Sequence, residues 1–322
     1  MPEFDPNNMP VPKVHQLLLG GVAPRPIALV STLSASGEPN LSPFSFFNVF
    51  GANPPVVAFS PSRRGRDASL KDTYHNLKET GECVIQAVTY PMTEQISLAS
   101  TEYEPGVNEF IKSGLTPVKS KIVKPFGVLE SPFRMECRLL ELKSYGDGGA
   151  SANIAVCEVL LFHVEDDLFV DGIIHPDRID LVARMSGDFY CRASGDAVFK
   201  IAKPVGRTGI GFDNLPEFIL RSDLLTASNL AQLANCEHLP ADEDVKEFIR
   251  STMEQALPGF SGSKEAFGRA QRRGDYKFMA VYALRLKRDD QYRGKAIELT
   301  AAAALKRGDT DFAWKILLCR EI

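Results

Sequence analysis

Residues 133–164, FRMECRLLELKSYGDGGASANIAVCEVLLFHV, predict a long β-hairpin. In the first seven residues apolar and charged side chains alternate, which is the period of a strand with one buried face. The glycines of GDGG, residues 146–149, suit the positive φ angles of a hairpin turn. The returning run, residues 153–164, is apolar on both faces, as in a strand covered by a barrel interior on one side and by a helix or a second subunit on the other. The hairpin therefore indicates a β domain and a homodimer.

Three shorter runs that precede the hairpin also have the character of strands. RPIALVST (25–32), PPVVAFS (54–60) and ECVIQAV (82–88) contain β-branched residues and are bounded by Pro, Gly or Ser. After about residue 200 the sequence becomes helical. We therefore expect a mainly β domain over residues 1–205, a connector of loops and short helices over 206–240, and an α-helical extension over 241–322.

The helical extension repeats a short pattern. Its first helical run covers residues 245–257, and Arg273-Gly274-Asp275 recurs 34 residues later as Arg307-Gly308-Asp309. This period is typical of tetratricopeptide-type helical hairpins. Gly followed by Asp is also an ordinary junction between one helix and the next. A repeat of helical hairpins and a plain pack of helices therefore both remain open.

Composition excludes several classes of protein. Of the 322 residues, 44% are hydrophobic and 24% are charged, which is ordinary for a soluble globular protein. No apolar run reaches the roughly 18 residues of a membrane span, and residues 1–13 lack the apolar core of a signal peptide. We expect a cytoplasmic protein without a membrane-embedded part.

The cysteines, the histidines and the net charge exclude further kinds of site. The six cysteines form no Cys-x-x-Cys pair and several lie in apolar runs, so we expect buried thiols. The five histidines have no metal-ligand spacing, so we expect no metal site. The formal net charge is −4 and the basic residues gather in one short patch, which argues against a nucleic-acid partner.

The basic patch is SPSRRGRDASLKDT, residues 60–73. Three arginines and a lysine stand among hydroxyl side chains, with only Asp67 and Asp72 to oppose them. A solvated loop would explain the patch, and so would a pocket for a small multivalent anion.

A predicted helix favours the anion pocket. Ser69 and Asp72 resemble a capping box, and apolar residues follow at helical spacing until Gly81. The free backbone N–H groups of Leu70 and Lys71 would then lie at the positive end of the helix dipole. A phosphate group would fit there.

Seven segments, in this order, resemble the flavin reductase-like family, which has an FMN-binding split β-barrel. They are APRPIALVSTLSASGEPNLSPFSFFN (23–48), NPPVVAFSPSRR (53–64), SLKDTYHNLKETGECVI (69–85), EYEPGVNEF (102–110), ESPFRMECRLL (130–140), GDGGASANIAVCEV (146–159) and IDLVARMSGDFYCR (179–192). The resemblance covers about residues 10–200 and reaches about residue 240, whereas the helical tail lies outside it. It implies a homodimer that binds FMN near the subunit interface and reduces it with NADH or NADPH.

The resemblance also implies which residues bind FMN. The loop after the third strand and the following helix start would hold the phosphate, with Lys71 and Thr73 foremost because a point charge and a hydroxyl suit phosphate oxygens. The other phosphate candidates are Ser60, Arg63 and Arg66, with Asn76 near the phosphate or ribityl chain. Thr73 has the alternative of a plain helix-surface residue.

The same resemblance places the isoalloxazine ring against residues 40–48, NLSPFSFFN. The candidates are Ser42, Pro43, Phe44, Ser45 and Asn48. Phe44 could equally belong to the core. Arg25 matches the first cofactor-side strand of the family and could instead pair with an acid.

Hydride transfer from nicotinamide to flavin is carried by the cofactors and needs no acid–base pair in the protein. The sequence accordingly names no catalytic side chain. We expect an FMN-dependent NAD(P)H:flavin reductase that passes electrons to a small acceptor or a partner protein. The alternatives are an FMN electron carrier reduced by a partner, and a flavin-binding adaptor whose helical tail recruits a partner.

Overall fold

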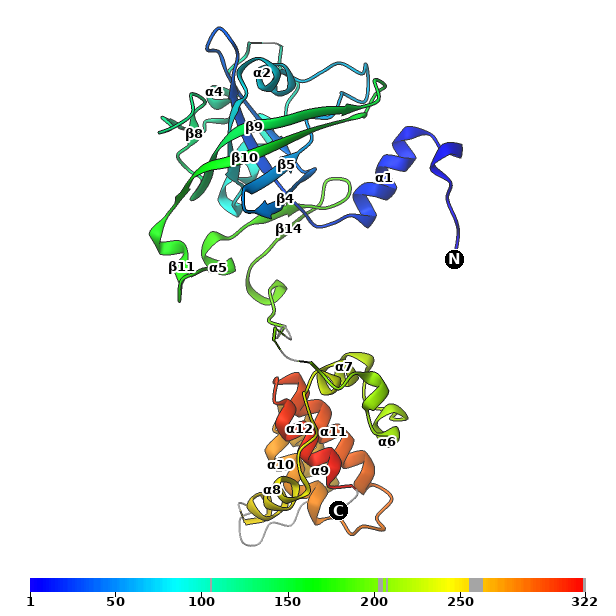
Figure 1. The fold of residues 1–322 in the computed structure, drawn as a ribbon. Coiled ribbons are helices and arrows are strands. Elements are labelled where there is room, and N and C mark those ends of the chain that lie inside the picture. The colour runs from blue at the N-terminus through cyan, green and yellow to red at the C-terminus, as the bar shows by residue number, and fades with distance from the viewer. Residues whose placement is uncertain (105, 202–204, 207, 255–262, 321–322) are drawn as a thin grey trace. The chain divides into compact units, whose positions relative to one another are not determined.

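The computed structural model describes residues 1–104, 106–201, 205–206, 208–254 and 263–320 (Figure 1). The chain divides into two compact units, residues 1–200 and 201–322. Among the described residues, no helix is both long enough and apolar enough to cross a membrane.

Unit 1 is mainly β, as predicted. Within the described residues its largest sheet has seven strands in the order β3-β2-β6-β9-β10-β5-β4, and every neighbouring pair is antiparallel. These strands are β2 (Ala28–Leu33), β3 (Pro39–Phe44), β4 (Phe47–Ala52), β5 (Pro55–Phe59), β6 (Glu82–Ala87), β9 (Phe133–Tyr145) and β10 (Ala152–Val164). The short strands are β1 (Arg25–Pro26), β7 (Pro117–Val118), β8 (Gly127–Val128), β11 (Phe169–Val170), β12 (Ile173–Ile174), β13 (Val182–Arg184) and β14 (Tyr190–Arg192).

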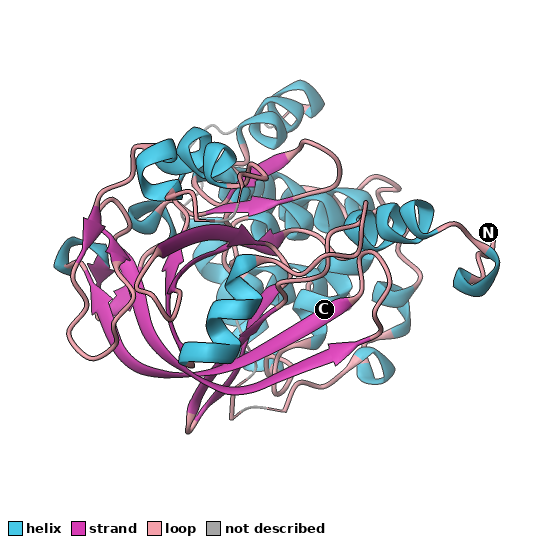
Figure 2. Cartoon of the chain, turned by 90° about the horizontal axis from the view of Figure 1, so that it is seen from above, coloured by secondary structure: helices cyan, strands magenta, loops and turns pink. Residues whose placement is uncertain are grey.

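The predicted hairpin is confirmed: β9 and β10 pair along their whole length around the turn at residues 146–151. Two shifts of register occur in it, one after Val156 and one after Val159. Such bulges bend a strand, and the long strands curve visibly in Figure 2. The sheet contributes to two apolar cores, one that includes Val30 and Phe44 and another that includes Leu29 and Leu41.

The core of the sheet follows the predicted alternation in β9. Met135 and Cys137 point into it, whereas Arg138 is exposed. Glu136 also lies on the face away from this core, yet its side chain is fully buried. The prediction of buried thiols is confirmed for four of the six cysteines, namely Cys83, Cys137, Cys157 and Cys319.

The helices of unit 1 cover parts of the sheet or project from it. They are α1 (Val11–Gly21), α2 (Asp72–Thr80), α3 (Thr93–Ala99), α4 (Glu109–Ser113) and α5 (Pro176–Ile179). Helix α2 packs on β2 and β3, and α4 packs on β3. Helix α1 has no buried residue and projects from the barrel (Figure 1).

Unit 2 is helical. Its helices are α6 (Glu217–Leu220), α7 (Ala227–Ala234), α8 (Asp242–Glu254), α9 (Lys264–Arg273), α10 (Tyr276–Arg285), α11 (Arg293–Lys306) and α12 (Thr310–Leu318). The end of the helical run expected over residues 245–257 lies outside the described residues. Trp314 is central to the core of this unit and donates from its indole N–H to Leu233 O at 3.1 Å.

Residues 206–240, expected as a connector, belong to the core of unit 2. Leu215, Ile219, Leu225 and Leu233 are all buried in it. Of the helices in this stretch, α7 packs on both α11 and α12. The boundary between the units falls after residue 200 rather than after residue 205.

The Arg-Gly-Asp repeat marks two helical hairpins with the same turn. Gly274 and Gly308 follow α9 and α11 with φ of 68° and 78°. Asp275 and Asp309 then cap α10 and α12, each accepting a hydrogen bond from the backbone N–H three residues later. The Tyr276 hydroxyl of the first turn donates to Asp309 of the second at 2.9 Å, which ties the two turns together.

Candidate functional site

The loop of residues 60–71 borders a pocket of about 640 Å³ in unit 1, which we call the Lys71 pocket. It is lined by Val11, Pro12, His15, Pro43, Phe44, Ser45, Phe46, Ser60, Ser62, Arg63, Arg64, Gly65, Lys71, Glu102, Gly149 and Ala150. The pocket therefore brings together six of the twelve cofactor residues predicted from sequence: Pro43, Phe44, Ser45, Ser60, Arg63 and Lys71.

Lys71 is the central charge of the pocket. Its side chain passes along Phe44, and Nζ lies 5.1 Å from the centre of that ring. Burial lowers the pKa of the Lys71 ammonium, the neighbouring Arg64 lowers it further, and Glu102 raises it. No carboxylate of the described residues forms an ion pair with Lys71. A desolvated cation without a counter-ion attracts an anion from solution.

Two arginines stand beside Lys71. Arg63 Nη1 donates to Ala68 O at 2.8 Å, while the buried Arg63 Nε has no partner among the described residues. Arg64 Nη1 donates to Leu70 O at 2.7 Å and to Ser69 Oγ at 3.2 Å. These bonds hold both guanidinium groups against their own loop at the Lys71 pocket.

Two hydroxyl groups complete the polar wall of the pocket. Ser60 Oγ and Ser62 Oγ lie 2.9 Å apart, and Ser60 Oγ accepts a hydrogen bond from Asn153 N at 3.3 Å. Pro43, Phe44 and Ser45, at the end of β3 and just beyond it, form a less polar part of the wall. A cationic, hydroxyl-rich end beside an aromatic wall fits a ligand that has a phosphate and a planar ring.

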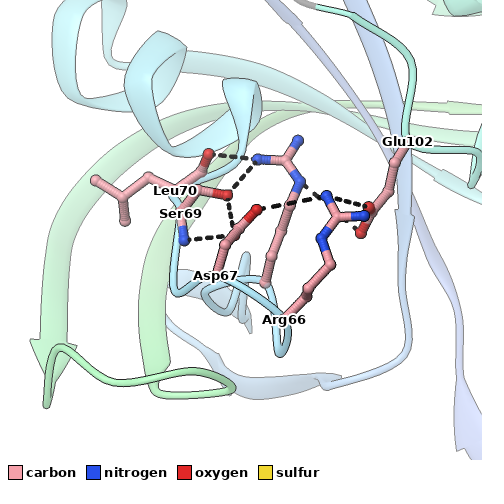
Figure 3. A network of polar contacts seen from close by, with 6 residues as sticks. Arg66, Asp67, Ser69, Leu70 and Glu102 are labelled. Carbon is pink, nitrogen blue, oxygen red and sulfur yellow. Dashed lines mark hydrogen bonds and ion pairs between the residues drawn. The ribbon is translucent and has the colours of Figure 1, made fainter.

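The rim of the pocket carries a carboxylate, Glu102, from the loop between α3 and α4. Its Oε1 lies 3.9 Å from Arg64 Nε and its Oε2 lies 3.5 Å from Arg66 Nη2. Arg66 also pairs with Asp67 at 3.4 Å, and Asp67 in turn accepts hydrogen bonds from Ser69. Figure 3 shows this network at the foot of α2.

The predicted helix start is wrong by two residues, because the N-cap is Lys71 and not Ser69. Ser69 does not cap α2, because its N–H and hydroxyl both donate to Asp67 Oδ1, at 2.9 and 2.6 Å. Helix α2 begins at Asp72, with Lys71 as its N-cap, and ends as predicted at Gly81 with φ of 69°. Leu70 and Lys71 therefore precede the helix, and Lys71 contributes its side chain to the pocket.

The structure does not bring Thr73 and Asn76 to the pocket. Thr73 is 1% exposed and donates from Oγ1 to Asn40 Oδ1 at 2.8 Å. Asn76 is 6% exposed and donates to Thr32 Oγ1 at 3.0 Å. Asn40 also donates to Glu109 at 3.1 Å. These side chains form a buried polar network between α2, β2, β3 and α4, so they hold the helix in place instead of facing a ligand.

Arg25 also has a role inside the fold. It is 5% exposed and donates to the carbonyl oxygens of Leu19, Val22 and Met185, at 2.6 to 2.8 Å. Burial lowers the pKa of this guanidinium, and Arg184 lowers it further. Arg25 therefore does not pair with an acid, which was the alternative. Its N–H groups donate to carbonyl oxygens at the end of α1 and just after β13.

The three remaining predicted residues lie at the edge of the pocket or elsewhere. Ser42 is half-buried on β3, just before Pro43 of the pocket wall. Arg66 is exposed at the rim, with 78% of its side chain accessible. Asn48 lies on β4 and lines a second, mainly apolar pocket of about 640 Å³. Phe46, which precedes β4, lines the Lys71 pocket, whereas Phe47 and Asn48 of β4 line the second pocket.

Sequence reasoning missed the residues that reach the pocket from distant segments. His15 comes from α1, Glu102 from the loop after α3, and Gly149 from the turn between β9 and β10. Gly149 was identified only as part of a turn. No local signal in the sequence places any of the three beside Lys71.

Comparison with known proteins agrees with this geometry. Residues 20–178, all within unit 1, match the flavin reductase like domain family. An uncharacterized protein of Aquifex aeolicus is 37% identical over 189 residues, which make up 58% of this chain and 94% of the relative. Nitrilotriacetate monooxygenase component B from Bacillus cereus has a similar structure, with a TM-score of 0.59 and 29% identity, over 62% of this chain and 98% of that one.

A further solved structure shows the same architecture. It is a protein of Shewanella frigidimarina described as a flavin reductase with a split barrel domain, with a TM-score of 0.54 and 24% identity over 63% of this chain and 100% of that chain. The antiparallel sheet of unit 1 is thus a split barrel, followed here by a helical region. On these grounds the chain belongs to the flavin reductase like domain family.

Proposed function

We propose that the protein is an FMN-dependent oxidoreductase of the NAD(P)H:flavin reductase type, which passes electrons onward to a small acceptor or a partner protein. One observation carries the proposal: the Lys71 ammonium lies desolvated among Arg63, Arg64 and two serine hydroxyls, and no carboxylate in the described part of the chain forms an ion pair with it. Membership of the flavin reductase like domain family supports a flavin as the ligand.

The chain's own residues fit the two ends of FMN. Ser60, Ser62, Arg63 and Lys71 would hold the phosphate, because they supply hydroxyl donors, a guanidinium group and a point charge. Pro43, Phe44 and Ser45 would flank the ring. Bound FMN supplies two-electron redox chemistry, and NADH or NADPH is the proposed donor. The protein's part is to orient the ring and to exclude water from it.

We include a homodimer in the proposal, on the basis of strand β4. This strand is at one end of the strand order, and its Val49 and Phe50 are 65% and 70% exposed. An apolar edge strand invites pairing with another chain. The mainly apolar pocket that contains Asn48 also borders β4, so a second copy of the chain placed there would cover both features. The six free thiols suit the reducing cytoplasm, which is the proposed location.

The test is the visible absorption spectrum of the purified protein with added FMN, recorded without oxygen before and after NADH and then NADPH. Flavin bands near 450 nm, about where the free cofactor absorbs, that bleach with one donor support the reductase and name that donor. Bands that persist with both donors point to an electron carrier reduced by a partner. A protein that binds no FMN contradicts the proposal and favours an adaptor.

A further inference from the structure

We propose that the Glu102 carboxylate competes with the phosphate of FMN for the Lys71 pocket. When no anion is bound, Glu102 lies beside Arg64 and Arg66 at the rim of the pocket. Its negative charge weakens the binding of flavins that carry a phosphate, and not of flavins without one. This inference rests on the proposed function. It adds a residue that sets how tightly the site holds FMN relative to the same flavin without its phosphate.

Glu102 is the one carboxylate among the described residues that line the Lys71 pocket. The lining has three cations, Arg63, Arg64 and Lys71, and one carboxylate, Glu102, which gives a net charge of +2 with His15 counted as neutral. A phosphate monoester carries about −1.5 to −2 charges at pH 7. The lining therefore balances such a group while Glu102 is ionised, and it exceeds that charge when Glu102 is neutralised.

The distance between Glu102 and Arg64 is longer than the hydrogen bond that Arg64 makes to its own loop. Arg64 makes its short hydrogen bond to Leu70 O at 2.7 Å, whereas its Nε stands 3.9 Å from Glu102. The Glu102 side chain is 56% exposed and its second oxygen lies 3.5 Å from the exposed Arg66. Exposed ion pairs of this kind contribute little to the stability of the fold. A phosphate that enters the pocket can therefore displace the Glu102 carboxylate while the protein stays folded.

The field of Glu102 also reaches Lys71, with which it forms no ion pair. Glu102 raises the pKa of the Lys71 ammonium, against the lowering by burial and by Arg64. The carboxylate thus stabilises the positive charge that would hold the phosphate, and the same negative charge repels the phosphate. Figure 3 shows Glu102 approaching the foot of α2 from a separate segment of the chain.

The chain offers a matched control. Glu104 lies two residues further along the same loop, is exposed, does not line the pocket and has no ion pair among the described residues. Replacing either glutamate by glutamine removes one negative charge from the loop. Only the change at residue 102 removes a charge from the pocket.

The experiment measures dissociation constants of FMN and of riboflavin by flavin fluorescence at low ionic strength, for wild type, Glu102→Gln and Glu104→Gln. We expect Glu102→Gln to bind FMN about two- to fivefold more tightly, the range for an exposed charge pair. Riboflavin affinity should stay unchanged, and Glu104→Gln should behave as wild type. The gain should shrink as salt is added, because salt screens charges at this exposure.

Two results would overturn the inference. If wild type binds FMN and Glu102→Gln leaves the FMN constant unchanged, or shifts FMN and riboflavin equally, Glu102 does not compete with the phosphate and the proposed function still stands. If wild type binds neither flavin, the proposed function fails, and this inference fails with it.

Discussion

The backbone of Gly149 lies against Gly65, so that a Cβ atom on Gly149 would stand 2.5 Å from Gly65 O. In the same place Arg63 N donates to Ser151 O at 3.0 Å. The turn of the long hairpin is therefore packed directly on the loop that carries Arg63 and Arg64. The hairpin that defines the barrel also fixes the shape of the Lys71 pocket.

Gly149→Ala should push these two backbones apart. The atom it meets is a backbone oxygen, which cannot move aside as a side chain would, so we expect a loss of about 1–3 kcal/mol in unfolding free energy and weaker FMN binding. Gly148→Ala is the matched control, since its Cβ would meet nothing closer than Ser151 Oγ at 3.9 Å. Urea unfolding and an FMN titration measure both effects. Equal behaviour of the two variants would contradict the role of this contact.

Lys71→Met should weaken FMN binding and leave riboflavin binding unchanged. The methionine keeps an apolar side chain beside Phe44 and removes the charge, and a charge-assisted hydrogen bond of about 1.5–3 kcal/mol corresponds to about 10- to 150-fold in affinity. Lys78→Met, in the last turn of α2 and exposed, is the control. An unchanged FMN constant in Lys71→Met would remove Lys71 from the phosphate site.

Thr73→Val should affect stability and not the ligand. It deletes the 2.8 Å hydrogen bond to Asn40 inside the buried network, at a cost of about 1–2 kcal/mol. Thr73→Ser keeps the hydroxyl and should restore most of that loss. FMN affinity should stay within about twofold of wild type, because Thr73 does not line the Lys71 pocket. A large loss of FMN affinity in the folded valine variant would show that Thr73 does reach the ligand.

Glu136 should make stability depend on acid pH. Burial raises the pKa of this carboxyl, but hydrogen bonds from Lys121 N, His163, Val123 N and Ile122 N outweigh burial and bring it below its ordinary value of 4.5. The folded pKa is thus lower than the unfolded one, so this stabilisation is complete above pH 4.5 and is lost as pH falls through the folded pKa.

The corresponding measurement is urea unfolding of wild type, Glu136→Gln and Glu141→Gln as a function of pH. Glu136→Gln should lose about 2–4 kcal/mol near pH 7 and show a smaller decline in acid than wild type. Glu141 is exposed on the same strand, so Glu141→Gln should follow wild type. A wild-type decline that survives in Glu136→Gln would assign the acid sensitivity to other groups.

Phe50→Asp should weaken the proposed homodimer. A charge on the exposed edge strand β4 opposes burial against a second copy, so we expect a smaller mass in sedimentation at micromolar concentration. Ile111→Asp provides the control, because Ile111 is 77% exposed on α4, which packs on β3 at the other end of the strand order. A monomeric wild-type chain would contradict the homodimer itself.

Much of the pocket could be predicted because its cationic residues belong to one short loop. Ser60, Arg63 and Lys71 lie within twelve residues of sequence, and any fold of that loop keeps them near one another. Thr73 and Asn76 are predicted for the same site because the family resemblance places the phosphate at this loop and at the start of the helix that follows it. Asp67 holds Ser69 in a turn, and the helix turns these two side chains toward Asn40 and Thr32.

By itself, the sequence determined the elements whose signals are local: the period-two alternation of residues 133–139, the glycine-rich turn, the end of α2 at Gly81, and the Gly-Asp junctions of the helical unit. Only the tertiary structure decided that Glu102 and Gly149 meet the loop of Lys71, and that Arg25 faces carbonyl groups. The reason is physical. Strand period and capping depend on neighbours within a few residues, whereas the pocket is made by contacts between segments far apart in the chain, whose positions depend on how the whole sheet curves and packs.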